Sequence, residues 1–161
     1  MTSTTTTTAP AWLTGLEQRP DLPTREQAVK WVIVADRELP RGVQANAVAC
    51  LAAAVGRQAP ALVGEGATDA SGSPHAGLPW IGCSILGVTA PIVRTVREAA
   101  LAEPDLLVAD MATVAQRIRV YDDYRAALAG SADEDIAYHA VSIAGPRALV
   151  DRLTGRFPLL K

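Results

Sequence analysis

The sequence predicts an α/β sandwich in which helices pack on a largely parallel sheet. Apolar runs of strand length alternate along the chain with longer segments of helical character. The first of these runs, residues 30–36, ends on a charged residue and passes through a Pro/Gly turn into an alanine-rich helix. Open α/β sheets place their ligands at such junctions, so we expect a ligand site there.

Length and composition indicate one compact domain with an aliphatic core. The chain has 161 residues, of which 49% are hydrophobic and 4% aromatic, so small aliphatic side chains must fill its interior. The net charge of -2 provides no field that attracts a polyanion, and nucleic acid is therefore not an expected partner. The apolar runs are too short to span a bilayer and no signal peptide is recognisable, so we expect a cytoplasmic protein.

The first 23 residues are expected to lie outside the folded domain. Residues 1–10 are nearly all threonine and serine, a composition typical of disordered tails. Residues 11–18 have apolar positions spaced for one amphipathic turn, which can dock on the body of the protein. Trp12 is then either a small anchor or an exposed hydrophobic residue. The single folded domain is expected over residues 24–161.

The first half of the domain is expected to contain a strand, a helix and a long loop. Residues 30–36 form the strand, and residues 43–55 form a helix that is apolar on nearly every side and so is buried against the sheet. Gly56 is expected to end this helix. Residues 61–79 are rich in Gly, Ser, Asp and Pro. They predict a hairpin, or a loop with one short strand near Leu62, with a tight turn at residues 69–72.

The second half repeats the alternation of strand and helix. A strand at residues 80–86 precedes a helix that Thr89 caps, that has Pro91 in its first turn and that ends near residue 103. Residues 106–110 resemble the first strand, because they are an apolar run that ends in an aspartate. The remaining elements are an amphipathic helix with a solvated charged face, a fourth strand, a helix and a closing extended segment, at residues 112–128, 138–144, 146–154 and 157–160.

Two aspartates are candidates for acid–base chemistry. Asp36 and Asp110 follow aliphatic strands and could face one another across the carboxyl edge of the sheet, with Glu38 close by. A carboxylate that is half desolvated by an apolar wall has a raised pKa and can act as an acid or a base. The alternative is that each aspartate caps the turn or helix that follows it. Spacing favours the capping role for Asp36 and leaves both roles open for Asp110.

Other familiar site patterns are missing from the sequence. It has no glycine-rich phosphate loop and no Cys/His spacing that suits a metal, so we expect neither a nucleotide cofactor nor a metal. Cys50 and Cys83 lie in apolar segments and are expected to be buried, reduced thiols. His139 is expected to be a packed strand residue, whereas His75 could line the mouth of a site or belong to a plain loop.

Three segments together resemble the type 2 peptidyl-tRNA hydrolase superfamily, and most closely an uncharacterised bacterial branch of it. They read KWVIVADRELPRGVQANA from Lys30, LLVADMAT from Leu106 and IAGPRALVDRLTGRFPLL from Ile143. The resemblance covers residues 30–161. It implies a three-layer α/β/α sandwich with a four-stranded mixed, mostly parallel sheet and a homodimer. It also implies a cleft formed by the loop after the first strand, the start of the first helix and the segment around Asp110.

The start of the first helix departs from the family's Gly-Lys-x-Ala-Ala-Gln pattern. Residues 42–47 read Gly-Val-Gln-Ala-Asn-Ala, so Val43 occupies the lysine position and Ala47 the glutamine position. Cys50 replaces a histidine three residues further on. Valine supplies neither the cation that a phosphate needs nor a group that polarises a carbonyl. The change therefore favours a smaller and less anionic ligand than tRNA.

The favoured hypothesis is a small-molecule enzyme or binder that performs acid–base chemistry on an amine- or amide-containing, amino-acid-derived substrate. Asp110 and Thr113 match the family's motif and are the expected catalytic residues, and no cofactor is expected. One concrete reaction is a Pictet–Spengler-type condensation in specialised metabolism. The expected substrate-binding residues are Asp36, Glu38, Val43, Gln44, Asn46, Cys50 and His75.

Two other functions stay open. The protein could be a non-catalytic dimeric ligand-binding module in which Asp36 and Asp110 serve only as caps. It could also retain peptidyl-tRNA hydrolysis through other basic residues, namely Arg37 and Arg41, which flank the turn after the first strand.

Overall fold

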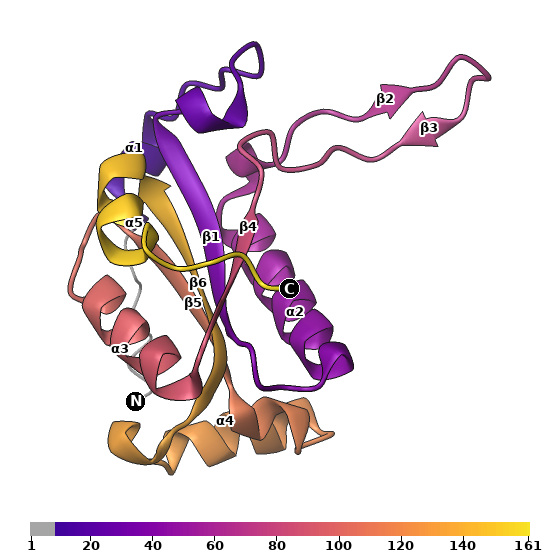
Figure 1. Cartoon of the computed structure of the whole chain (residues 1–161). Helices are drawn as coiled ribbons and strands as arrows, with labels where there is room; N and C mark the ends of the chain where they lie inside the picture. The colour runs from indigo at the N-terminus through magenta and orange to yellow at the C-terminus, as the bar shows by residue number, and fades with distance from the viewer. Residues whose placement is uncertain (1–8) are drawn as a thin grey trace.

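The computed structural model describes residues 9–161, and most of the predicted disordered tail, residues 1–8, lies outside them. The main sheet has four strands in the order β4-β1-β6-β5 (Figure 1). A separate two-stranded hairpin projects from the body. The strands are β1 (Val29–Asp36), β2 (Ala67–Thr68), β3 (Pro74–His75), β4 (Ser84–Val88), β5 (Leu107–Ala112) and β6 (Tyr138–Pro146).

The sheet is mixed, as expected. The prediction that it is mostly parallel is wrong, because only one of its three strand pairs is parallel. β1 pairs in parallel with β4, whereas β6 pairs antiparallel with both β1 and β5. The reason is the connection after β5, where helix α4 (Tyr121–Ala129) lies across the end of the sheet (Figure 1). Because this connection does not cross back over a face, the next strand must run in the opposite direction. β1, β4 and β5 still share one direction, so their carboxyl ends meet at the same edge.

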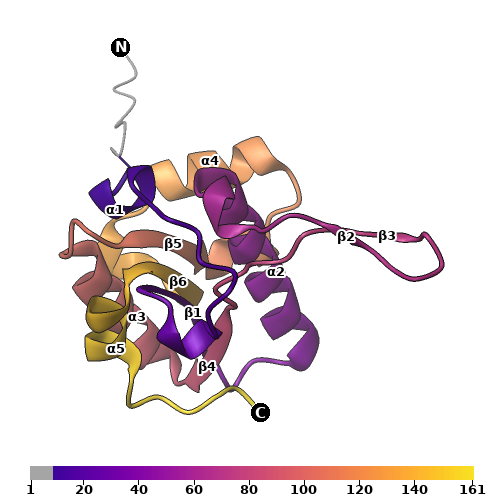
Figure 2. The ribbon, with the colours of Figure 1, turned by 90° about the horizontal axis from the view of Figure 1, so that it is seen from above.

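Helices cover both faces of the sheet (Figure 2). Helix α2 (Arg41–Gln58) packs on one face, around Ile33, Leu51 and Val55. Helices α3 (Ala90–Leu101) and α5 (Arg147–Thr154) pack on the other face. The buried side chains on both sides are mainly Val, Leu, Ile and Ala, as the composition predicts. Gly56 does not end α2, which continues to Gln58, because Gly56 lies on the helix as an ordinary interior position.

The amino-terminal docking segment is present as helix α1 (Ala11–Thr14). Trp12, Leu13 and Leu16 pack against the core on the α2 face. The indole Nε1 of Trp12 donates a hydrogen bond to the backbone oxygen of Asp105, at 2.8 Å. Of the two roles left open for Trp12, the structure therefore supports the anchor.

For residues 61–79 the structure shows the hairpin, one of the two predicted alternatives, and residues Pro60–Leu62 form a 3-10 turn and not a strand. Two other predicted elements differ from the sequence-based expectation. The second strand begins at Ser84 instead of residue 80, because Gly82 adopts a φ of 69° and interrupts the extended backbone. The long amphipathic helix is divided into a 3-10 turn, Thr113–Gln116, and α4, since the backbone N–H of Thr113 is bonded to the oxygen of Ala137 next to β6.

The last residues of the chain lie along the free edge of β4. The backbone N–H of Gly87 donates to Pro158, and that of Leu160 donates to Ile85, both at 2.9 Å. A Cβ atom on Gly87 would come within 3.0 Å of a side-chain carbon of Leu160, so glycine permits this close approach. The predicted closing extended segment is present, and it acts as a partial fifth strand.

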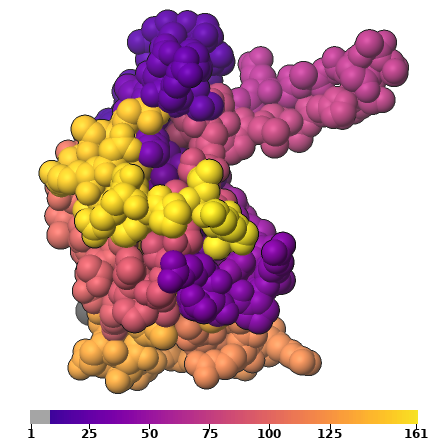
Figure 3. Space-filling view, in the orientation of Figure 1, coloured from indigo at the N-terminus to yellow at the C-terminus, as the bar shows by residue number. Residues whose placement is uncertain are grey.

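Residues 63–80 form the projecting hairpin, which we call the arm (Figure 3). The predicted turn at residues 69–72 lies at its tip. Asp69 holds this turn, because its Oδ1 accepts hydrogen bonds from the backbone N–H groups of Ser71 and Ser73, at 2.8 and 2.9 Å. The hydrogen bond from Ser73 is the main cause that lowers the pKa of Asp69. The arm therefore has a defined conformation although it is surrounded by solvent.

One buried hydrogen bond across the sheet provides a test of the core. Trp31 Nε1 donates to Ser142 Oγ at 2.8 Å, and both residues are buried. Ser142→Ala leaves the indole N–H without a partner, so we expect the free energy of unfolding to fall by about 1–3 kcal/mol. Urea unfolding measures the loss. Ser71→Ala, which removes an exposed hydroxyl at the tip of the arm, is the control and should change stability by less than about 0.5 kcal/mol.

Candidate functional site

The predicted site residues gather mainly at the edge where β1, β4 and β5 end. β1 delivers Asp36 to this edge and β5 delivers Asp110, and Thr113 follows β5 directly. β6 lies between β1 and β5, and across it Asp110 is level with Val34 and not with Asp36. The two aspartates are therefore separated by two strand spacings, roughly 9–10 Å, and in addition by two residues along the strand. They do not form a carboxylate pair.

Asp36 acts as a cap. It is buried, and its Oδ1 accepts a hydrogen bond from the backbone N–H of Glu38, at 3.0 Å. The buried side chain of Gln44 donates to the backbone oxygen of Asp36, at 3.2 Å, and so closes the same turn from the α2 side. Glu38 points to solvent and pairs with Arg37. Asp36 and Gln44 position the start of α2, whereas Arg37 and Glu38 line a separate cavity of about 370 Å³ beside the carboxyl-terminal segment.

Asp110 is held by an arginine that the sequence analysis missed. The Nε of Arg97, on α3, lies 2.7 Å from Asp110 Oδ2, and the two side chains are 15% and 28% exposed. Arg97 also reaches Asp133 at 3.2 Å and stacks on the ring of Tyr138, 4.2 Å from its centroid. Burial acts to lower the pKa of Arg97, but the hydrogen bond and charge of Asp110 raise it on balance. The pair therefore fixes the position of the Asp110 carboxyl group.

A cavity of about 440 Å³ lies between α2 and α4, and we call it the α2–α4 cavity. Three predicted site residues line it, namely Asn46, Cys50 and Asp110. The rest of its wall is mainly aliphatic and aromatic, with the Arg119 side chain as a further polar group. The aromatic part comes from Tyr121 and Tyr124, whose ring centroids are 5.7 Å apart. Burial, and then the charge of Asp110, raise the pKa of Tyr124.

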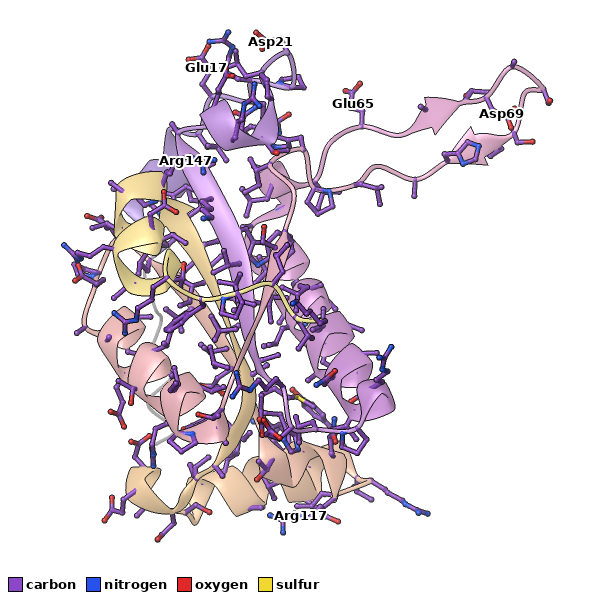
Figure 4. All side chains as sticks on the ribbon, in the orientation of Figure 1. Glu17, Asp21, Glu65, Asp69, Arg117 and Arg147 are labelled. Carbon is purple, nitrogen blue, oxygen red and sulfur yellow. The ribbon has the colours of Figure 1, made fainter. Side chains whose placement is uncertain are left out.

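A second cavity of about 440 Å³ opens beside the first, and we call it the His139 cavity. Its lining includes Val43, Thr113, Arg117 and His139. Arg117 lies at the α4 end of the molecule in Figure 4. The Gln116 side chain lines this cavity and donates to Val43 O and to Asn46 Oδ1, both at 3.2 Å. The structure thus places Thr113 in one cavity and Asp110 in the other.

His139 is directed into its cavity by a β-bulge. Tyr138 pairs with Ala112 and Ala140 pairs with Met111, so His139 is the extra residue between two paired positions. Bulges commonly redirect a side chain next to a functional site. Burial lowers the pKa of His139, the charge of Asp36 opposes this effect and the charge of Arg117 adds to it. His139 lies on a strand, as predicted, but it also lines a cavity, which the prediction did not include. No periodicity in the sequence indicates the bulge.

The remaining candidate residues fall outside both cavities or are inert. His75 lies on the arm, exposed to solvent and 3.5 Å from Asp69. Cys83 is half-buried, and burial raises its pKa to about 12, so it is a thiol at neutral pH, as expected. Cys50 is exposed on α2, which corrects the expectation that it is buried.

The described residues do not form a metal centre. Among residues 9–161, no group of three or more His, Cys, Asp or Glu side chains could hold a metal ion. Within the same part of the chain, every helix is too short or too polar to cross a membrane.

Comparisons with known proteins identify the family and the fold. A family model described as a protein of unknown function, DUF2000, matches residues 29–161. A solved structure of a protein of unknown function from Agrobacterium tumefaciens is similar, with a TM-score of 0.75 and 15% sequence identity, over 83% of this chain and 98% of that chain. At this identity the similarity shows the fold alone. No curated protein matches the chain. Neither match names a peptidyl-tRNA hydrolase.

The environment of His139 predicts a pH dependence of stability. Its folded-state pKa is lowered from 6.5, so the unfolded chain binds a proton more readily than the folded protein. Stability is therefore complete above pH 6.5 and falls as the pH drops toward the folded-state pKa. Urea unfolding between pH 7.5 and 5 should show this loss, and His139→Gln should reduce it. His75→Gln, which changes the exposed histidine, should leave it intact.

Proposed function

The chain belongs to the DUF2000 family, whose description states no activity, and from the site we propose a function for it. It binds a small amine- or amide-containing molecule in the α2–α4 cavity, and Asp110 performs acid–base chemistry on that molecule. The observation that carries this proposal is the position of Asp110. Its carboxylate is fixed by Arg97 from one side, and the residue also lines a largely apolar cavity.

The lining of the cavity suits an amine with an apolar body. A carboxylate attracts a protonated amine, and the attraction is stronger where an apolar wall excludes water. Tyr121 and Tyr124 can contact the cation through their ring faces, and Asn46 supplies an amide for a neutral polar group. The volume of about 440 Å³ is in the usual range for small-molecule sites.

Asp110 acts first as a base. Its carboxylate, held in place by Arg97, accepts a proton from the bound molecule and returns it later. A condensation of the Pictet–Spengler kind is compatible with this role. In that reaction an amine and an aldehyde form an iminium ion with loss of water, a ring carbon attacks it, and a base removes the ring proton.

We also propose that the scaffold is related to the type 2 peptidyl-tRNA hydrolases, on the strength of the three motifs that resemble them. Peptidyl-tRNA hydrolysis itself has weaker support. Val43, at the family's lysine position, lines the His139 cavity, and Arg37 is already paired with Glu38 at 3.1 Å. Cleavage of a peptidyl-tRNA mimic that Arg41→Ala abolishes would favour this function over the small-molecule proposal.

A specific observation favours a second candidate function, that of a non-catalytic binder. Asp36 is occupied as a cap and Asp110 is occupied by Arg97, so both carboxylates have structural partners. In that case the α2–α4 cavity holds its ligand unchanged. Turnover distinguishes the two functions, because the binder takes up the amine and releases it without reaction.

Binding of matched probes tests the role of Asp110. We expect 2-phenylethylamine to bind more tightly than 3-phenylpropionate, which has a similar body and the opposite charge. Asp110→Asn should weaken amine binding about tenfold, the equivalent of about 1.4 kcal/mol, because the charge is lost while the shape stays. Calorimetric titration measures both affinities. Asp133→Asn removes the other carboxylate that Arg97 contacts and should leave the amine affinity nearly unchanged.

Equal affinity for the amine and the acid, or an amine affinity that Asp110→Asn leaves intact, would contradict the proposed site. Where the protein converts an arylethylamine and an aldehyde, Asp110→Asn should lower kcat about a hundredfold or more. Binding without any conversion would leave the non-catalytic function as the correct one.

A further inference from the structure

The arm is an unsupported part of the molecule. Every residue from 65 to 76 is exposed, and both views of the ribbon show the hairpin standing away from the body (Figures 1 and 2). An isolated two-stranded hairpin is at best marginally stable in water, because its side chains have no core to pack on. The arm therefore lacks the burial that normally stabilises such an element.

The base of the arm is nevertheless built for one fixed geometry. A Cβ atom on Gly77 would lie 1.8 Å from the backbone oxygen of Gly64, and one on Gly66 would lie 2.5 Å from that of His75. Only glycine permits the two backbones to come so close. Leu78 and Val63 lie beside these glycines and are 76% and 36% exposed. An apolar patch thus lies at the base of the arm, where the two backbones are closely packed.

The outward face of α2 is a second surface without a partner. The helix carries no charged residue between Arg41 and Arg57, although solvated helix faces are normally rich in charge. Its exposed positions are small or weakly polar, namely Gly42, Ala45, Asn46, Ala49, Cys50 and Ala53. A helix of this composition is typical of one that is covered by protein.

The two surfaces complement each other in charge and in length. The arm carries Glu65 and Asp69 and no Lys or Arg, whereas α2 carries Arg41 and Arg57 and no Asp or Glu. Glu65 extends from the arm toward solvent in Figure 4. Each leg of the arm is about nine residues and spans roughly 30 Å at 3.3 Å per residue. The 18 residues of α2 span about 27 Å at 1.5 Å per residue.

We propose that two copies of this chain form a dimer in which the arm of each copy lies along the outward face of the other copy's α2. The arm stands away from the body in both views (Figures 1 and 2), so it leaves the outward face of its own α2 uncovered. A two-fold axis makes both contacts at once, since the same two surfaces meet twice. Together they supply about the 20–30 residues per copy that stable interfaces use.

The dimer also completes the α2–α4 cavity. Asn46 and Cys50 lie on the outward face of α2 and line that cavity. An arm placed along this face forms the outer wall of the other copy's cavity and restricts its access to water. This consequence does not depend on which ligand the cavity binds.

Sedimentation velocity across the micromolar range tests the proposal with the full chain. The wild type should be a dimer, and a variant with residues 66–76 replaced by a short glycine linker should be a monomer with unchanged circular dichroism. Glu65→Lys should raise the dimer dissociation constant about tenfold. Asp69 is unsuitable for a charge reversal, because its side chain holds the turn at the tip of the arm. Glu134→Lys, which changes an exposed acidic residue at the other end of the molecule, is the matched control.

Charge reversal on both surfaces sharpens the test. Arg41→Glu with Arg57→Glu should weaken the dimer, and adding Glu65→Lys to that pair should restore part of the affinity. Raising the salt concentration should weaken the wild-type dimer, since exposed charges are screened. A wild-type protein that is monomeric throughout, or a dimer that tolerates loss of the arm, would overturn the proposal.

The two cysteines provide an internal readout. Cys50 lies on the face that the arm should cover, whereas Cys83 lies within the fold and its thiol is unreactive at neutral pH. Alkylation of Cys50 should be several-fold slower in the wild type than in the arm-shortened variant, and Cys83 should react slowly in both. Equal Cys50 rates in the two proteins would contradict the placement of the arm on α2.

Discussion

The antiparallel insertion of β6 between β1 and β5 organises the molecule. β6 hydrogen-bonds to both neighbours along most of its length, and it also contributes Ser142, the partner of the buried Trp31 indole. β6 is antiparallel to both β1 and β5, and β4 is parallel to β1. The strands β1, β4 and β5 therefore share one direction, and their carboxyl ends lie at the same edge of the sheet. The loops and short helices that follow those strands then have a common place at which to build cavities.

The same insertion explains why the candidate site has two parts. Because β6 lies between β1 and β5, it keeps Asp36 away from Asp110. The bulge in β6 then places His139 between the strands that carry the two aspartates. Gln116 links the two cavities, because its side chain donates to Val43, which lines the His139 cavity, and to Asn46, which lines the α2–α4 cavity. The edge therefore offers Asp110 beside one cavity and His139 beside the next.

The sequence predicted the local elements well and the long-range arrangement less well. The strand that ends at Asp36 and the helix after it follow from apolar runs and a Pro/Gly turn, which are local signals. The capping role of Asp36 was also favoured by spacing alone. The pairing of β6 was missed because it depends on how a connection crosses the sheet. The sequence also predicts that α2 ends at Gly56, but the helix continues to Gln58.

In the candidate site, too, local sequence signals predicted single residues but not their partners from other elements. Asp110 was singled out by its place after an apolar run, but its partner Arg97 lies on a different element and faces it only in the folded chain. The bulge at His139 has no periodic signature. The expected joint action of Asp110 with Thr113 came from motif resemblance, and the folded geometry assigns the two residues to separate cavities.

The carboxyl-terminal segment has a consequence for how the protein behaves at high concentration. An uncovered strand at the margin of a sheet is a template on which other chains can add strands and aggregate. Residues 158–160 occupy that template along β4 through bonds at Gly87 and Ile85. The last few residues thus protect this strand edge from intermolecular pairing. A carboxyl-terminal truncation or tag would remove or displace them and expose the edge of β4.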